Sequence, residues 1–213
     1  MSNPYQEIST TNYIDQDPTG TGYGVDFSHD STYMAVAHNV TPFITIYKRD
    51  GDTFTKLPNP ETLPASTVEG VSFSHDSTYM AVAHWATPFV TIYKRNGDVF
   101  TKLDNPETLP ADTGWGVAFS HDSTYMAVSH STTPFVTIYK RNGDVFTKLP
   151  NPEALPPDNG IGVAFSHDSL YMTVVHRTTP FVIIYKYDGV PIIIMILTAF
   201  QENDDINLTW IYE

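Results

Sequence analysis

Short runs rich in apolar and β-branched residues, separated by turn residues, set the pattern of the chain. In the stretch from Gly116 to Leu149, Ser-His-Asp-Ser separates the first two runs and Asn142-Gly143 the last two. Both sequences favour tight turns. The pattern therefore predicts four short β-strands, at 116–120, 124–130, 135–140 and 144–149.

This four-strand pattern recurs every 46 residues. FSHDSTYMAV begins at Phe27, Phe73 and Phe119, and the variant FSHDSLYMTV begins at Phe165. No helical periodicity of 3.6 residues accompanies the repeat. A period in the forties that contains several short strands is typical of the blade of a β-propeller.

The second and third strands of each unit carry apolar residues on both faces. Tyr125 and Ala127 alternate with Met126 and Val128, so neither face of the strand is polar. Such a sheet must be covered on both sides, as blades packed around an axis are. The sequence therefore predicts an all-β, β-propeller-like fold with four 46-residue, four-stranded blades.

The predicted blades span 24–69, 70–115, 116–161 and, in part, 162–189, between an N-terminal segment at 1–23 and a divergent tail at 190–213. The register of the repeat places Glu7 to Thr11 at a fourth-strand position, where the segment could complete the last blade and close the ring. It places Pro191 to Leu197 at the same strand position. Leu208 to Tyr212 falls where a fifth blade would begin. A closed four-bladed ring, a degenerate fifth blade and closure by a homo-oligomer all remain open.

Composition narrows the classes of function. With 24 acidic and 11 basic residues, the formal charge of −13 argues against nucleic acid as a partner. The absence of cysteine excludes disulfides and thiolate chemistry. The opening MSNPYQEIST predicts no secretory signal, which favours a cytoplasmic or virion-associated protein. The apolar run from Val190 to Phe200 is too short to span a membrane, and we expect no membrane insertion.

All eight histidines fall in two periodic sets, which raises the question of a metal site. One set lies in the first turn of each blade and the other ends each second strand: His29, His75, His121 and His167, then His38, His84, His130 and His176. The second set should lie too far apart to share a zinc ion. The first set should surround the axis at closer range, and distance alone does not exclude a metal there. Adjacent Ser28, His29 and Asp30 cannot converge as a hydrolytic triad. We therefore predict no metal, no cofactor and no catalytic residue.

Differences among the near-identical copies supply the candidate binding residues. They cluster in two places, the loop between the second and third strands and the approach to the first strand. The eight residues are Asn39, Trp85, Ser131 and Arg177 in the loop, and Tyr23, Glu69, Trp115 and Ile161 before the strand. Both places should open on the same end of the propeller. Exposed loops on a rigid scaffold commonly bind partners, and Trp, Tyr and Arg often dominate the binding energy. Register places Trp85 and Trp115 at one blade junction, where we expect an apolar anchor with Arg177 and Glu69 beside it.

The FSHDSTYMAV run followed by FVTIYK resembles the WD-repeat-like class of β-propellers, with Tyr139-Lys140 where the Trp-Asp pair would stand. Near-identical arrays of this kind are also similar to repeats in bacteriophage tail or virion-associated proteins and in prophage-like bacterial proteins. That resemblance implies surface or receptor recognition. We predict a non-enzymatic binding module for a protein or surface glycan. The alternatives are a lectin-like binder with one site per blade and a metal-dependent hydrolase.

Overall fold

The computed structural model describes residues 4–5, 14–187, 197–202 and 205–210, and all of its regular structure is β. Four antiparallel sheets follow one another along the chain, and we call them blades 1 to 4. The prediction of an all-β propeller-like fold built from 46-residue units is confirmed. Among the described residues, no helix is long and apolar enough to cross a membrane.

Each of the first three blades contains four strands, and the described part of the fourth contains three. Blade 1 consists of β1 (Gly22–Phe27), β2 (Tyr33–His38), β3 (Ile44–Asp50) and β4 (Thr53–Lys56). Blade 2 consists of β5 (Val68–Phe73), β6 (Tyr79–His84), β7 (Val90–Asn96) and β8 (Val99–Lys102). Blade 3 consists of β9 (Gly114–Phe119), β10 (Tyr125–His130), β11 (Val136–Asn142) and β12 (Val145–Lys148). Blade 4 consists of β13 (Gly160–Phe165), β14 (Tyr171–His176) and β15 (Val182–Lys186).

The turns follow the sequence signals, with one shift. In the first turn of blade 1, the Ser28 hydroxyl donates to Asp30 Oδ1, 2.6 Å away, and the same carboxylate accepts the backbone N–H of Thr32. The last hairpin of blade 3 turns through Gly143 and Asp144, because Asn142 pairs with Val145. The predicted turn at Asn142-Gly143 was therefore one residue early. Gly143 has φ of +58°, a conformation that glycine adopts at little cost.

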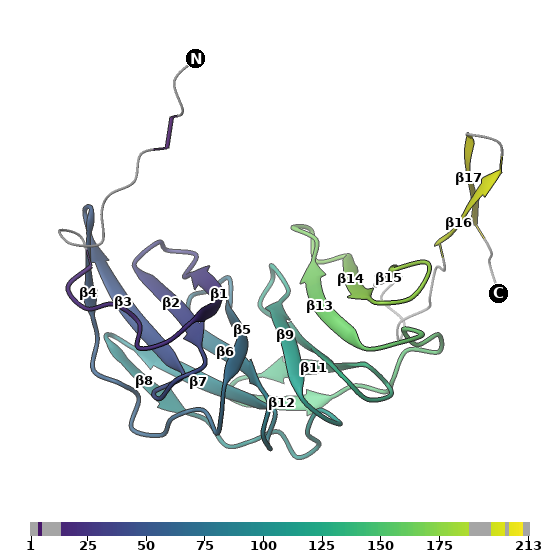
Figure 1. Ribbon diagram of the computed structural model, residues 1–213. Coiled ribbons are helices and arrows are strands. Elements are labelled where there is room, and N and C mark those ends of the chain that lie inside the picture. The colour runs from purple at the N-terminus through teal and green to yellow at the C-terminus, as the bar shows by residue number, and fades with distance from the viewer. Residues whose placement is uncertain (1–3, 6–13, 188–196, 203–204, 211–213) are drawn as a thin grey trace.

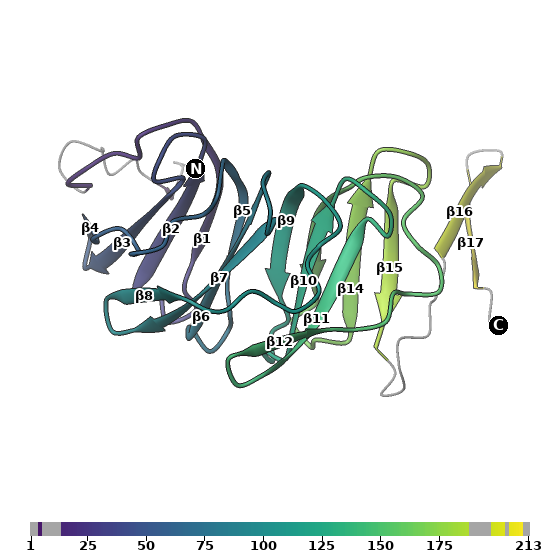
Figure 2. The same cartoon turned by 90° about the horizontal axis from the view of Figure 1, so that it is seen from below.

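The blades form an open arc rather than a closed ring (Figures 1 and 2). Their first strands line the inside of the arc, where β1 contacts β5, β5 contacts β9, and β9 contacts β13. Blades 1 and 4 lie at its two ends. The glycine in the middle of each inner strand permits this close approach. A Cβ on Gly24 would lie 2.8 Å from the carbonyl oxygen of Glu69 in the next blade, and one on Gly70 would lie 3.0 Å from that of Trp115.

The hydrophobic core is divided among the three interfaces between blades. Each interface packs one face of a blade against the opposite face of the next, and each forms its own cluster of buried residues. In the first cluster, Tyr33, Ala35 and Ile46 of blade 1 meet Phe73 and Met80 of blade 2. The expectation that both faces of every internal sheet are covered is therefore confirmed.

The segments proposed for ring closure are only partly described. Residues 14–16 lie against blade 1, where Ile14 bridges to Phe54 and the Tyr47 hydroxyl donates to the Gln16 carbonyl. The predicted closing strand, Glu7 to Thr11, lies outside the described residues, as do most residues of the competing Pro191 to Leu197. In the tail, β16 (Leu197–Glu202) pairs with β17 (Asp205–Trp210) in a separate two-stranded sheet. The described part of 208–212 is thus not an inner strand of a fifth blade.

The histidines that end the second strands belong to the core. In blades 1 to 3 the imidazole Nε2 lies 2.9 Å from the hydroxyl of a threonine on the third strand, in the pairs His38–Thr45, His84–Thr91 and His130–Thr137. Blade 4 has Ile183 at the threonine position, and both ring nitrogens of His176 are buried without a partner among the described residues. In three blades the imidazole bonds within its own blade through Nε2, and in all four its Nδ1 is buried without a hydrogen-bond partner among the described residues. Burial in the sheet gives these residues a packing role.

A methyl group at the close approach between inner strands tests the packing around the axis. We expect Gly24→Ala to lower the free energy of unfolding by about 1–3 kcal/mol, because the neighbouring backbone must move. Gly22→Ala is the matched control. Its nearest neighbour would be Val36 at 3.6 Å, so it should change stability by less than about 1 kcal/mol. Urea unfolding measures both, and equal effects would contradict the close-approach explanation.

The buried histidines predict a loss of stability on mild acidification. Burial lowers the pKa of His84 and of His130 from 6.5 to about 4. The unfolded chain therefore binds more protons between these pH values, and the free energy of unfolding falls as the pH drops from 6.5 towards 4. Each histidine contributes a slope of up to about 1.4 kcal/mol per pH unit. Urea unfolding across this range should show a smaller slope for His84→Asn, and an unchanged slope would contradict the assignment.

Candidate functional site

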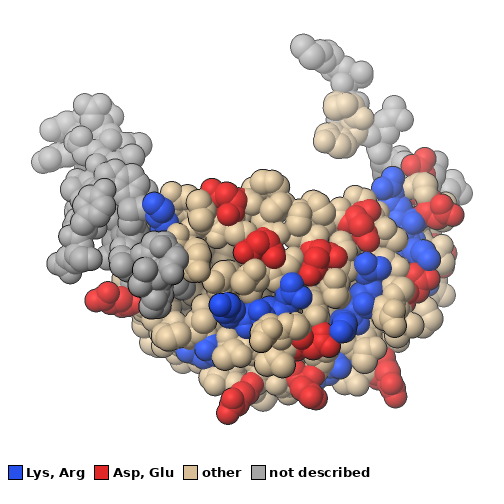
Figure 3. Space-filling model, turned by 180° about the vertical axis from the view of Figure 1, so that it is seen from behind, with Lys and Arg blue, Asp and Glu red and all other residues tan. Residues whose placement is uncertain are grey.

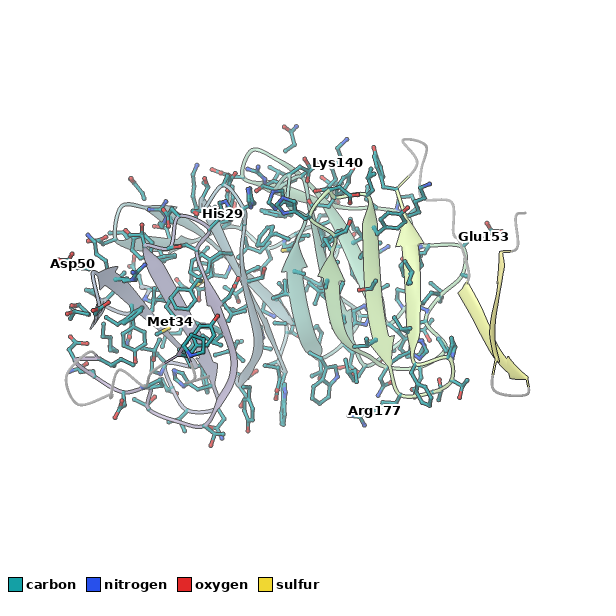
Figure 4. The ribbon with its side chains drawn as sticks, turned by 90° about the horizontal axis from the view of Figure 1, so that it is seen from above. His29, Met34, Asp50, Lys140, Glu153 and Arg177 are labelled. Carbon is teal, nitrogen blue, oxygen red and sulfur yellow. The ribbon has the colours of Figure 1, made fainter. Side chains whose placement is uncertain are left out.

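The eight candidate binding residues lie on one rim of the arc, which we call the variable rim. The loop members, such as Arg177, follow the ends of the second strands, and the other members lie beside them at the starts of the inner strands. The first-turn histidines lie on the opposite rim, as the labelled His29 and Arg177 show (Figure 4). The expectation that both variable positions open on one end of the fold is met.

The second variable position lies inside the inner strand and not in the loop before it, as the sequence had suggested. In blade 1 Gly22 pairs with His38 and Gly24 with Ala37, so Tyr23 is the extra residue of a β-bulge. The same register shift occurs in the other three blades and involves Glu69, Trp115 and Ile161. A bulge leaves one residue unpaired and redirects its side chain. The scaffold therefore presents one variable side chain per blade at a fixed place on the rim.

Trp85 and Trp115 contact each other across the boundary between blades 2 and 3. Their ring centroids lie 6.2 Å apart with the planes inclined at 58°, a distance within the range of favourable aromatic pairs. The Trp85 side chain is 50% exposed and Trp115 is half-buried. The expectation that these two residues share a blade junction is confirmed by this contact.

Polar groups border the tryptophan pair. Burial raises the pKa of Glu69, and a hydrogen bond with Trp85 lowers it in part. The indole Nε1 of Trp115 is buried and has no hydrogen-bond partner among the described residues. A buried donor of this kind is costly unless an acceptor reaches it. The junction therefore combines exposed aromatic surface, a half-buried carboxyl group and one unsatisfied N–H donor.

The other members of the variable rim form smaller groups. Within blade 1, the Asn39 amide lies 3.5 Å from the Tyr23 hydroxyl. In blade 3, a hydrogen bond from Ser131 helps to lower the pKa of Asp112, after the larger effect of Thr132. Ile161 and Arg177 are both exposed on blade 4. Arg177 is thus two blades away from Glu69, and the structure does not bring these two residues together beside the tryptophans.

The first-turn histidines form a row along the inner edge of the opposite rim. Successive ring centroids lie 3.4, 3.4 and 3.6 Å apart from His29 through His75 and His121 to His167. Desolvation, followed by repulsion from neighbouring imidazoles, lowers the pKa of His75 and of His121. They line a shallow cavity of about 310 Å³ with the ends of the inner strands. Among the residues that the structure describes, no three His, Asp or Glu side chains converge as metal ligands.

Charged side chains are mixed across the face of the arc that lies behind the view of Figure 1. Lys and Arg form a band there, with Asp and Glu on both sides of it (Figure 3). Two ion pairs in this region join neighbouring blades, Lys48 to Asp98 at 2.9 Å and Lys94 to Asp144 at 2.8 Å. Exposed pairs of this kind contribute at most about 1 kcal/mol each. They fix the register of neighbouring blades more than they stabilise the fold.

Comparisons with known proteins bear on the fold. No family model matches the chain, and no curated protein matches it. Solved structures do match. Hydrazine synthase from Kuenenia stuttgartiensis superposes with a TM-score of 0.63 at 11% identity over 93% of this chain. A putative 6-phosphogluconolactonase from Bacteroides uniformis gives 0.64 at 13% identity over 88%.

The structure of U3-55K gives a TM-score of 0.62 at 12% identity over 85% of the chain. At these identities the likeness concerns the fold alone. The matches cover 53%, 55% and 53% of the respective solved chains, so the protein spans about half the length of each. The arc is therefore similar to part of a β-propeller.

Proposed function

We propose that the protein is a non-enzymatic binding module that recognises its partner through the variable rim, with Trp85 and Trp115 as the central anchor. The observation that carries this proposal is the contact between the two indoles at a blade junction, with one of them half exposed. Tryptophan is among the residues that most often dominate interface energies. Two indoles that already contact each other on a rigid scaffold need little ordering before they bind, which reduces the entropic cost of association.

The differences among blades favour a single composite site over a lectin with one site per blade. The paired bulge and loop residues are Tyr and Asn in blade 1, Glu and Trp in blade 2, Trp and Ser in blade 3, and Ile and Arg in blade 4. Repeated identical sites would require the same side chains at each pair. The chemistry of the rim instead changes from aromatic and acidic near its centre to apolar and basic on blade 4. One partner that covers several blades fits this gradient.

A bacterial or phage surface component is the first class of partner to examine. The repeat array is similar to virion-associated arrays, and aromatic surfaces bordered by a carboxyl group suit both protein and sugar ligands. The partner's apolar surface would cover the exposed half of Trp85. A metal-dependent hydrolase has less support, because the four strand-end histidines lie in separate blades and three of them use Nε2 to bond a threonine.

The anchor can be tested by removing both indoles. Trp85→Ala together with Trp115→Ala should abolish attachment to bacterial cells or to arrayed bacterial surface glycans. Loss of a central aromatic anchor costs about 2 kcal/mol or more. Trp85 is an exposed loop residue, so its substitution alone should change the free energy of unfolding by less than about 0.5 kcal/mol, and removal of the half-buried Trp115 should add a moderate further loss.

The matched control for the anchor is Val99→Ala, an exposed residue in the last hairpin of blade 2 on the opposite rim. It should bind as the unmodified protein does. Two results would contradict the proposal: full attachment of the double variant, or a large fall in its melting temperature that reveals the indoles as core residues.

Chelation distinguishes this module from the hydrolase alternative. We expect treatment with EDTA to leave both the unfolding midpoint and cell attachment unchanged. Three of the four strand-end histidines bond a threonine, and the rings of neighbouring first-turn histidines contact each other. Elemental analysis of untagged protein is the second measurement. Stoichiometric zinc or nickel, lost together with stability on chelation, would support the hydrolase instead.

A further inference from the structure

The two ends of the arc expose the two halves of a blade interface. In blade 1 the exposed half contains Val25 and Phe27, which are 62% and 47% exposed. Their counterparts one repeat later, Val71 and Phe73, are 8% and 6% exposed because blade 1 covers them. At the far end, Val175 and Val182 of blade 4 are exposed, whereas their counterparts Ala83 and Val90 in blade 2 are fully buried.

Polar contacts specify how neighbouring blades align. Where blade 1 meets blade 2, the Tyr33 hydroxyl and the Lys48 ammonium both bind the carboxylate of Asp98, at 2.6 and 2.9 Å. In the same interface, Arg95 reaches back to Asp30 at 3.4 Å. Blades 2 and 3 repeat the arrangement, with Tyr79 and Lys94 on Asp144 and with Arg141 on Asp76. A complete interface thus has an aromatic hydroxyl, two cations and two carboxylates.

The last interface within the chain has lost this set. Position 190, which corresponds to Asp98 and Asp144, is Val, and position 187, which corresponds to Arg95 and Arg141, is Tyr. The Tyr187 ring instead packs on Tyr125, with centroids 5.5 Å apart. Blade 4 therefore attaches to blade 3 mainly through apolar and aromatic contacts.

The free ends, by contrast, retain every member of the set. Blade 4 carries Tyr171, Lys186 and Asp168, and blade 1 carries Asp52 and Arg49, each at the corresponding position of its repeat. If blade 1 of a second copy followed blade 4, Asp52 would meet Tyr171 and Lys186, and Arg49 would meet Asp168. The backbone N–H of Asp168 would also find Ser31, as that of Asp30 finds Ser77 at 3.1 Å. The end faces are therefore complementary in shape and charge.

We propose that two copies of this chain join head to tail, blade 4 of each against blade 1 of the other, into a closed ring of eight blades. The partner is a second copy because the free faces repeat the established interfaces residue by residue. The number two follows from the size of the arc, which matches 53–57% of the propeller chains that it resembles. Head-to-tail contacts that return to the start close a ring without leaving a free face.

A slot in blade 4 that no described residue fills extends the proposal to the N-terminal segment. Phe100 and Phe146 of the outermost strands each pack between a tyrosine of the preceding blade and a phenylalanine of their own, with centroids 5.7–6.2 Å apart. In blade 4 the corresponding Tyr125 and Phe165 line a cavity of about 420 Å³. Ile8 falls at the position of Phe100 and Phe146 in the repeat, six residues before Ile14. We assign Glu7 to Thr11 of the second copy as the strand that fills this slot.

The mass of the protein in solution tests the ring. Light scattering after gel filtration should give twice the mass of one chain, constant over a range of micromolar concentrations. Val25→Asp on the blade 1 face and Val182→Asp on the blade 4 face should each give folded monomers. Val145→Asp is the matched control. That valine is 64% exposed on an outermost strand, away from the end faces, and its substitution should leave the mass unchanged.

Mixing the two monomeric variants tests the orientation. Each retains one intact face of opposite kind, so the mixture should form heterodimers that neither variant forms alone. If like faces paired instead, the Val25→Asp variant would still form a dimer, because its two blade 4 faces are intact. A dimer of that variant alone would overturn the head-to-tail arrangement. A monomeric unmodified protein, or a mass that grows with concentration, would overturn the closed ring.

Deletion of residues 1–12 tests the exchanged strand. The truncated protein should dissociate more readily on dilution and melt at a lower temperature than the full chain, because blade 4 loses its outermost strand. A truncated protein with the mass and melting temperature of the full chain would overturn the exchange and assign the slot to Pro191 to Leu197.

Discussion

The packing of one face of a blade against the opposite face of the next is the interaction on which this structure depends. No blade has a core of its own, since each sheet is apolar on both faces and one sheet deep. The buried clusters are shared, as when Tyr33 and Ala35 of blade 1 enclose Phe73 and Met80 of blade 2. The stability of the fold is therefore approximately a sum over pairs of neighbouring blades, as in other repeat proteins. The weakest pair is the one whose interface lacks some of the usual contacts.

This arrangement separates scaffold from recognition. Residues that face the neighbouring blades repeat almost unchanged, because each interface imposes the same demands on volume and polarity. Residues at the bulge and in the adjacent loop meet no such demand, and there the copies diverge to Tyr23, Glu69, Trp115 and Ile161. Variation at these positions leaves the packing intact. A surface of this kind can change its partner without changing its fold.

Much of the fold could be predicted from the sequence, because the repeat shows each strand and turn several times. The two-faced apolar pattern around Met126 identified sheets that are covered on both sides. The junction of Trp85 with Trp115 followed from register alone. The bulge was missed because a single inserted residue between two glycines, as in Gly22-Tyr23-Gly24, does not disturb a repeat that carries the insertion in every copy. It is visible only in the pairing with the second strand.

The shape of the arc could not be predicted, since curvature depends on small rotations between blades that no residue pattern encodes. For this reason the histidines from His29 to His167 were expected around an axis, whereas the structure places them in a row along an open edge. The tail was harder still. Its sequence departs from the repeat after Tyr187, so strand positions there could not be inferred from the earlier copies. In the structure β16 pairs with β17 in a separate hairpin instead of forming a further blade.

The glycine in the middle of each inner strand sets a constant spacing between blades, and this constancy bears on how the gene could change. Near-identical repeats recombine readily, and loss or gain of one 46-residue unit would leave a blade 1 face and a blade 4 face at the two ends. Copy number would then alter the span of the arc in steps of one blade without altering how its ends fit. A ring of identical chains would close without an exposed end face only if the number of blades per chain divides the number of blades in the ring.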